Sequence, residues 1–269
     1  MDIRKLSPVH AATIKALLLE APYEAIALRG LINYGNLAIL PWYGSFHDEE
    51  LVGVGMVIPN QLGLVWSRPG ISCSEIGHAL ATHSQPCTTI GPPECAETLW
   101  QGWTTKPYST THQTTLLATK VPTTQIHDGF RLATAEDIAL VARYSGAGEE
   151  EETGKNTFKE QPERLEKIVA NRIQMGHTWV IENEGDIVFQ VHVAPVLADC
   201  CQLVGTYVPP QHRGSGWSTI GVRGLLQAMI PQTKAVVLRV DNENIPAIKC
   251  YKANGFRPIA PFSVLNSHH

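Results

Sequence analysis

The residues best suited to chemistry lie in the run from Val204 to Ser218. An apolar strand ends there at a proline pair, and the glycine-bracketed segment Arg213-Gly214-Ser215-Gly216 leads into an apolar-periodic helix over 217–229. The first N–H groups of a helix have no partner within the helix and lie at the positive end of its dipole. Glycines let an anion approach those groups. The run therefore predicts a phosphate-binding turn, with an ordinary strand-to-helix turn as the alternative.

The spacing of the loop residues distinguishes between classes of phosphate-containing ligand. No lysine follows the last glycine, as a Walker A loop requires, and Thr219 stands where a dinucleotide fingerprint has its third glycine. The pattern Arg-x-x-Gly-x-Ser, from Arg213 to Ser218, instead resembles the pyrophosphate loop of the GNAT superfamily of N-acetyltransferases, which bind acetyl-coenzyme A. Ser218 departs from the usual glycine or alanine but is small.

A second motif follows about 30 residues later. Asn244 can cap a helix, Pro246 fits its first turn, and Asn254-Gly255 can end it. The pattern Asn-x-x-Ala-x-x-x-Tyr-x-x-x-Gly-Phe, which contains Tyr251, resembles the fourth-helix motif of the same superfamily. Two motifs in the family's order make an accidental match improbable.

The resemblance implies direct attack of an amine on the thioester carbonyl of acetyl-coenzyme A. It makes the backbone N–H of Val208 the oxyanion donor and Tyr251 the general acid that protonates the departing thiolate, with a core tyrosine as the alternative. The cofactor-binding residues that it implies are Thr206, Tyr207, Val208, Arg213, Gly214, Ser215, Gly216, Trp217, Ser218 and Asn244.

The general base is less clear, because Gly205 occupies the position where many family members have a glutamate. His192 is the catalytic candidate, with Asp199 or a water relay as alternatives. A lone histidine on a strand is more often structural. The acidic run Glu149–Glu152 reads as a loop between two helices, and if it faces the site it favours a cationic acceptor such as a polyamine, an aminoglycoside or a lysine side chain.

Composition limits the class of protein. The 269 residues carry a net charge of −4 and 43% hydrophobic residues, so we expect a packed core and neither a nucleic-acid nor a membrane partner. Six cysteines without C-x-x-C spacing and no visible signal peptide favour a cytoplasmic protein. Cys73, His78, His83 and Cys87 lack the close pairs of a zinc site, so no metal is expected.

The two halves begin alike. Ile3–His10 and Phe130–Asp137 each read as a short strand, a Ser or Thr cap and a helix. Predicted strands lie at 37–40, 51–58, 62–66, 88–90, 114–121, 178–181, 187–194, 201–208, 235–240 and 256–264. Predicted helices lie at 94–103, 163–175 and 246–253.

The resemblance covers about 129–265 and implies an α/β (α+β) fold of tandem GNAT-like domains, each a mixed, mostly antiparallel sheet flanked by helices. We predict a degenerate N-terminal domain over 1–125 and a catalytic acetyltransferase domain over 126–269, as in bacterial two-domain members of the superfamily. The predicted activity is acetyl transfer to a primary amine, on a small molecule or a lysine, by a monomer or homodimer. The alternatives are a non-catalytic acetyl-coenzyme A sensor and an acyltransferase that uses a longer acyl group.

Overall fold

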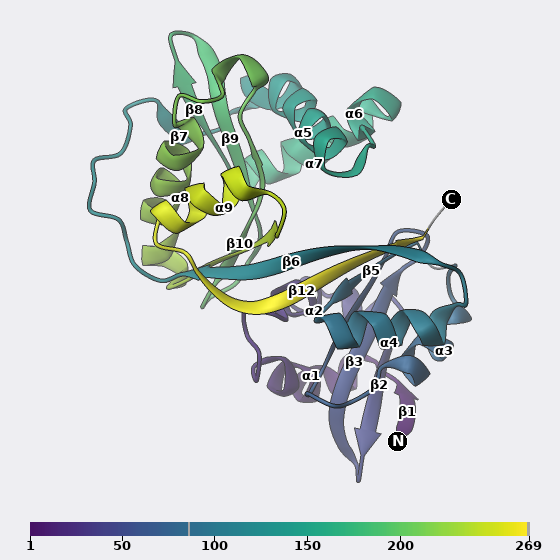
Figure 1. Cartoon of the computed structure of the whole chain (residues 1–269). Coiled ribbons are helices and arrows are strands. Elements are labelled where there is room, and N and C mark those ends of the chain that lie inside the picture. The colour runs from purple at the N-terminus through teal and green to yellow at the C-terminus, as the bar shows by residue number, and fades with distance from the viewer. Residues whose placement is uncertain (86, 268–269) are drawn as a thin grey trace. The chain divides into compact units, whose positions relative to one another are not determined.

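The computed structural model describes residues 1–85 and 87–267, and the chain divides into two compact units (Figure 1). The first unit contains Met1–Leu116, Arg239–Asn244 and the chain from Pro258. The second contains Leu117–Leu238 and Ile245–Arg257. Each unit is described by itself below.

The first unit has a mostly antiparallel sheet with strand order β1-β2-β3-β4-β5-β12-β6. Only the β4–β5 pair is parallel among the pairings whose register is described for this unit. Two helical layers flank the sheet. The strands are β1 (Asp2–Lys5), β2 (Trp42–His47), β3 (Glu50–Ile58), β4 (Leu62–Ser67), β5 (Thr88–Gly91), β6 (Tyr108–Ala118) and β12 (Arg257–Ser267), and the helices are α1 (Ala11–Leu18), α2 (Ile26–Asn33), α3 (Ser74–Ala81) and α4 (Pro93–Trp103).

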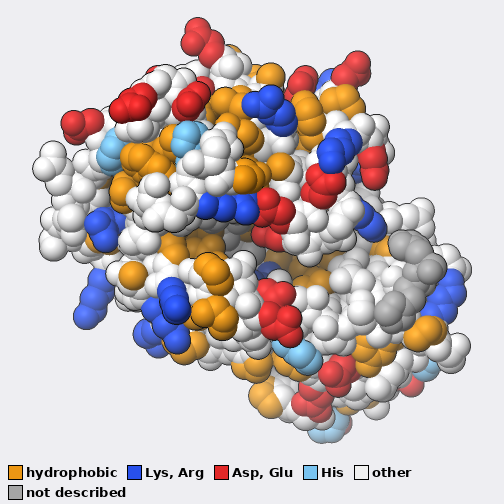
Figure 2. Space-filling model, turned by 45° about the horizontal axis from the view of Figure 1, so that its top comes forward, with side chains coloured by type: hydrophobic (Ala, Val, Ile, Leu, Met, Phe, Trp, Pro, Cys, Tyr) orange, Lys and Arg blue, Asp and Glu red, His pale blue; other side chains and the backbone are white. Residues whose placement is uncertain are grey.

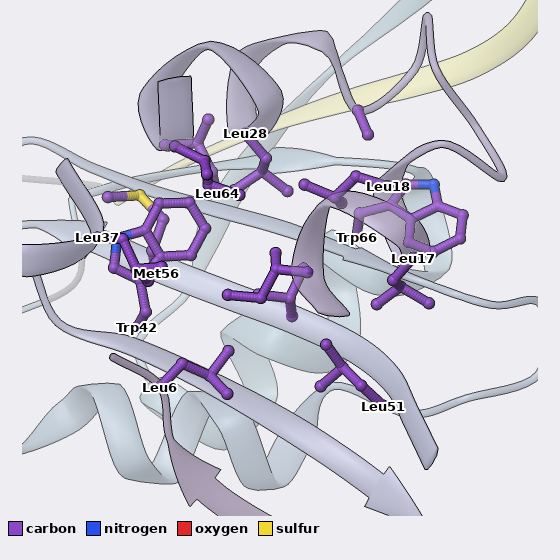
Figure 3. Packing of buried hydrophobic residues seen from close by; sticks show 14 of the residues in the cluster. Leu6, Leu17, Leu18, Leu28, Leu37, Trp42, Leu51, Met56, Leu64 and Trp66 are labelled. Carbon is purple, nitrogen blue, oxygen red and sulfur yellow. The ribbon is translucent and has the colours of Figure 1, made fainter. Parts of the chain in front are cut away.

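Strand β3 is buried on both faces, and its alternating side chains enter two separate cores. Val54 and Met56 join the cluster formed with α1 and α2, in which Met56 lies opposite Trp42 in the strand register (Figure 3). Val57 joins the cluster formed with α3 and α4. A continuous apolar run in the sequence is therefore a central strand that helices cover on both sides.

The second unit has strand order β7-β8-β9-β10-β11, antiparallel up to β10 and parallel between β10 and β11. Helices α5 and α7 pack together in one core cluster, with the small helix α6 beside them. Helix α8 lies against the sheet where its Gly221 meets the Phe189 ring. The elements are β7 (Phe130–Leu132), α5 (Ile138–Thr153), α6 (Thr157–Glu160), α7 (Pro162–Gln174), β8 (Thr178–Asn183), β9 (Asp186–Val196), β10 (Cys201–Tyr207), α8 (Trp217–Thr233), β11 (Val236–Asp241) and α9 (Ile245–Ala253).

Both units open with the same local structure: a strand, a capped 3-10 turn and a helix. In the first, the Ser7 N–H donates to His10 Nδ1 (3.1 Å), and in the second the Thr134 N–H donates to Asp137 Oδ2 (2.7 Å). Each is a capping box. The cap side chain accepts from the backbone of the third turn residue, and the side chain of that residue accepts from the backbone N–H of the cap. The repeat seen in the sequence is therefore a repeat of structure.

Three local predictions are wrong. The predicted strand at 37–40 is a 3-10 helix over Asn36–Ala38, and helices α2 and α3 were not predicted. The acidic run is the last turn of α5 rather than a loop, because glutamate is a good helix former and the helix ends only at Gly154, whose φ is 74°. Helix α8 continues beyond 229 to Thr233 in spite of Pro231.

The compact units do not follow a single cut of the chain. Strand β12 pairs with β5, so the C-terminal strand belongs to the first unit, although the prediction placed all of 126–269 together. Residues 239–244 also belong to the first unit. A sheet pairing between distant segments leaves no mark on local hydrophobic periodicity. As a division into domains, the predicted boundary at 125/126 stays a prediction.

Candidate active site

Strands β10 and β11 pair over two residues only. Their register joins Cys201 to Val236 and Gln202 to Val237, after which no β10–β11 pairing is described. On its other edge, β10 pairs with β9 at Val204–His192 and again at Tyr207–Gln190, with an irregularity between. The β11 side of residues 203–207 is therefore open, and an extended ligand can lie there as an added strand would.

Gly205 lies in this irregularity, and the conformation there needs glycine. Its φ is +60°, and an added Cβ would stand 2.7 Å from Cδ2 of His192. A glutamate at 205 would meet both obstacles. The His192 side chain therefore lies beside position 205, where the resemblance would place a base.

The glycine loop has the form expected of an anion site. Gly214 and Gly216 have φ values of 81° and 83°, and an added Cβ at either would meet nothing within 4 Å. Gly216 is the N-cap of α8, and no backbone N–H from 214 to 219 donates a hydrogen bond within the described part of the chain. The predicted turn thus presents accessible, unpaired amide donors.

Arg213 fastens this loop to helix α5. Its Nε donates to the carbonyl oxygen of Val208 (3.0 Å), and its Nη2 donates to Oε1 of Glu151 (2.7 Å). The guanidinium also lies 5.6 Å from the centroid of the Tyr207 ring. These contacts hold the Arg213 side chain in place, and through it they position the loop.

Tyr251 lies on α9, 8% exposed, with its ring edge-on to Phe256. Burial raises the pKa of its phenol to about 12, the neighbouring Thr206 hydroxyl lowers it, and the charges of Cys250 and Glu152 raise it further. The phenol therefore carries its proton at neutral pH. In the part of the chain that is described, the N–H of Val208 donates no hydrogen bond.

His192 is 1% exposed, and hydroxyl groups contact both of its nitrogens. Nδ1 is 2.9 Å from the Thr178 hydroxyl, and Nε2 is 3.2 Å from the Ser145 hydroxyl. Burial, and then the charge of Arg172, lowers the pKa of His192 to about 3. The imidazole is therefore neutral at physiological pH.

A cavity of about 360 Å³ opens beside these residues, within the second unit. Its wall combines residues of α5, α7 and the edge of β9 and β10. It contains His192, Gly205, Thr206 and Tyr207 from the strands, and neither Asp199 nor Asn244 is part of it. Asn244 precedes α9, and its N–H donates to the Asp241 carbonyl (3.0 Å).

The four carboxylates of the acidic run have different partners. Glu149 accepts from the backbone and hydroxyl of Thr157 (2.7 and 2.9 Å), and Glu150 pairs with Lys159 (2.7 Å). Glu151 pairs with Arg213 (2.7 Å). Within the described residues, Glu152 has no hydrogen bond or ion pair, although it lines the cavity.

Sequence reasoning missed Arg172, Ser145 and Gln190 as cavity residues. Arg172 was only a member of the predicted helix 163–175, and Gln190 was only a strand neighbour of His192. The available signal was that Gln190 and His192, two residues apart on the predicted strand 187–194, place polar side chains on the same face. In residues 1–85 and 87–267, no three His, Cys, Asp or Glu side chains are grouped as metal ligands. No described helix combines the length and the apolar character needed to cross a bilayer.

Comparison with known proteins finds a family match over part of the chain. Residues 145–256 match the sequence model of the Acetyltransferase (GNAT) family. This segment, less than half of the chain, is similar to a GNAT acetyltransferase domain. No curated protein matches the chain.

Solved GNAT structures share the fold along the whole chain. An acetyltransferase from Colwellia psychrerythraea is 14% identical, with a TM-score of 0.61 and 100% of both chains covered. A GCN5-related N-acetyltransferase from Sphaerobacter thermophilus is 14% identical, with a TM-score of 0.64, 98% of this chain and 94% of that chain covered. A tandem GNAT protein from the clavulanic acid biosynthesis pathway is 16% identical, with a TM-score of 0.55, 99% and 98% covered. The expected mixed α/β fold of tandem GNAT-like type is confirmed.

Proposed function

We propose that the protein is an acetyl-coenzyme A dependent N-acetyltransferase that acts on a primary amine by direct attack in a ternary complex. The observation that carries the proposal is the opening of β10 away from β11 beside a glycine loop with unpaired amides. The GNAT match over 145–256 supports it. Two motifs that are separate in sequence border this opening.

The residues present fit acetyl-coenzyme A. The unpaired amides from Gly214 to Ser218 suit a pyrophosphate. When bound, acetyl-coenzyme A supplies an activated acyl group as a thioester. The residues of the second unit that would hold it are Thr206, Tyr207, Val208, Gly214, Ser215, Gly216, Trp217 and Ser218, with Arg213 fastening the loop. Asn244 belongs to the first unit, and its contact with the pantetheine arm stays a prediction.

Two groups suit the acyl transfer. The unpaired N–H of Val208 would donate to the carbonyl oxygen as that oxygen gains negative charge. The phenol of Tyr251, with its pKa near 12, holds a proton that it can give to the departing sulfur. Burial of Tyr251 keeps bulk water from competing for that proton.

The proton of the amine needs a different group. Ser145 donates to the Val141 carbonyl (2.8 Å) and accepts from Gln190 Nε2 (3.0 Å), which favours His192 Nε2–H as a second donor to it. That arrangement supports a positioning role for His192, and a role as base stays a prediction. Glu152 lines the same cavity without a hydrogen bond or ion pair to any described residue, and desolvation followed by the charge of Glu151 raises its pKa. We propose Glu152 as the group that faces the amine.

The test measures both binding and turnover. Titration calorimetry should detect acetyl-coenzyme A binding, and thiol release should require an amine. Tyr251→Phe should lower kcat by about 10²- to 10³-fold with little change in acetyl-coenzyme A affinity. Tyr43→Phe is the matched control, because it removes a phenol that contacts His83 (2.9 Å) in the first unit.

The same measurements separate the alternatives. Tight binding without thiol release for any amine would favour a sensor. Tighter binding of a longer acyl-coenzyme A would favour another acyl group. Absence of binding would overturn the proposal. A cytoplasmic location and a monomeric or homodimeric state remain predictions.

A further inference from the structure

We propose that the acceptor is a zwitterionic amine, an amino acid, whose carboxylate pairs with Arg172 while its amino group faces Glu152. The cavity of the second unit is the binding site. The identification of this ligand as the acceptor rests on the proposed acetyl transfer. The binding preference itself does not.

Arg172 is the first reason. It is half-buried in the cavity wall, and in the described residues its guanidinium makes no hydrogen bond or ion pair. Burial lowers its pKa, which shows that the cation lacks compensation for lost water. A guanidinium fork matches a carboxylate in two parallel hydrogen bonds. A ligand carboxylate would supply the missing partner.

The neighbouring arginine does not share this property. Arg164, from the same helix, donates to the Gln161 side chain (3.1 Å). Arg164 lines the same cavity and so gives a second positive charge in the wall. It therefore provides a matched control for charge.

Each of the two charges acts on a different neighbour. The charge of Arg172 reaches His192, and that of Glu152 reaches Tyr251. Neither charge contributes to the pKa shift of the other, so they do not form an ion pair. In the β9–β10 register, His192 lies opposite Val204, farther from Val208 than Gln190 does. The amine end is thus toward the proposed acyl-transfer groups and the anion end away from them.

A buried acceptor supports the same orientation. Gln190 is fully buried, lines the cavity, and its Oε1 has no hydrogen-bond partner in the described residues. It lies opposite Tyr207 in the strand register, near the amine end. An unpaired carbonyl oxygen there needs an N–H donor. An amino group supplies one.

The charges in the wall balance. Two carboxylates, Glu149 and Glu152, face two guanidiniums, Arg164 and Arg172, and His192 is neutral. A zwitterion adds no net charge to this set. A polyamine would leave Arg172 unpaired and add a repelling cation, so the cationic acceptors favoured by the acidic run alone fit less well. The apolar side chains of Leu165 and Ile168, in the same wall, suit an aliphatic side chain.

The experiment compares each protein amino acid with its own amide and its decarboxylated amine, for example L-leucine, L-leucinamide and 3-methylbutan-1-amine. Binding to the full-length protein is measured by titration calorimetry with coenzyme A present, and turnover by thiol release. We expect at least one amino acid to bind about tenfold or more tightly than its amide. Arg172→Gln should remove that preference, Arg172→Lys should retain part of it, and Arg164→Gln should leave most of it.

The outcomes distinguish the two proposals. A carboxylate preference lost in Arg172→Gln, without turnover, supports the binding inference and overturns the acetyltransferase function. Turnover of amines with no carboxylate preference, or a preference unchanged in folded Arg172→Gln, overturns the inference and leaves acetyl transfer intact. Failure of every amino acid to bind more tightly than its amide also overturns it. Thermal melting of each variant checks that it is folded.

Discussion

Helix α3 of the first unit and helix α8 of the second follow corresponding strands, but the backbone amides at their N-termini differ in hydrogen bonding. At α3, the Cys73 N–H donates to the Thr98 hydroxyl of α4 (3.0 Å), and the Ser74 N–H donates to the Ser72 hydroxyl (3.3 Å). At α8, the amides from 214 to 219 have no partner in the described chain. The same element order thus gives one closed and one open helix terminus.

Close helix packing explains the closed case. An added Cβ at Gly102 of α4 would collide with the Ser74 carbonyl, and one at Gly77 of α3 would collide with the Leu99 carbonyl. The two helix backbones therefore touch directly. The comparison teaches that a helix N-terminus can be closed from within, by a neighbouring helix that accepts from an amide which would otherwise be open to a ligand.

The largest expected effect tests the open loop against the closed one. Gly216→Asp should weaken acetyl-coenzyme A binding by about 100-fold, or about 2.7 kcal/mol, because the introduced carboxylate repels the pyrophosphate and caps its amide donors. Gly70→Asp makes the same change in the loop before α3, at a φ of 76° in open space. Calorimetric titration should show unchanged affinity for Gly70→Asp, and equal losses in both variants would contradict the comparison.

A second expected effect is a fall in stability at low pH that originates in the second unit. His192 is the only histidine among the buried residues of the described chain, and its folded pKa of about 3 lies below the unfolded value of about 6.5. The unfolded state binds more protons between these values, so stability falls as pH drops below 6.5. The loss between pH 6.5 and 5 should be about 2 kcal/mol. His177, half-buried in the same unit, shifts in the same direction.

Urea denaturation at the two pH values measures this dependence. His192→Gln should show a shallower fall with acid, whatever its stability at pH 7. A pH dependence equal to that of the native protein would mean that other groups cause the acid sensitivity.

The smallest expected effect concerns the hydrogen-bonded N-terminus of α3. Thr98→Val leaves the Cys73 N–H without its acceptor and should cost about 1 kcal/mol of unfolding free energy, with acetyl-coenzyme A affinity unchanged. Thr104→Val removes an exposed hydroxyl that accepts from the Lys106 N–H (3.2 Å) and should change stability little. Denaturant titration of both variants measures the difference, and any effect on affinity would show that α3 takes part in binding.

Much of the second unit could be predicted from the sequence, because its signals are local. The glycine loop, the helix with Tyr251 and the capped opening at Thr134 depend on residues near one another in the chain. Strand β10, predicted over 201–208, is found over Cys201–Tyr207. The first unit was harder, since its helices α2 and α3 are short.

The acidic run shows where local signals fail. Four consecutive glutamates looked equivalent in the sequence, but three have partners on α6 or at Arg213. Glu152 lines the cavity and has no partner among the described residues. Figure 2 shows acidic and basic side chains interspersed on one face, so net charge alone indicates no partner. The free carboxylate and the free guanidinium were found only from their contacts.

The sequence by itself determined the GNAT resemblance, the glycine loop and the motif with Tyr251, because each requires particular residues at fixed spacing. Tertiary structure alone decided that β12 completes the first unit, that Gly205 makes room for His192, and that Arg172 lines a cavity with no partner among the described residues. Local motifs depend on backbone conformation over a few residues. The pairing of distant strands and the supply of a partner for each charge depend on packing, which no single segment specifies.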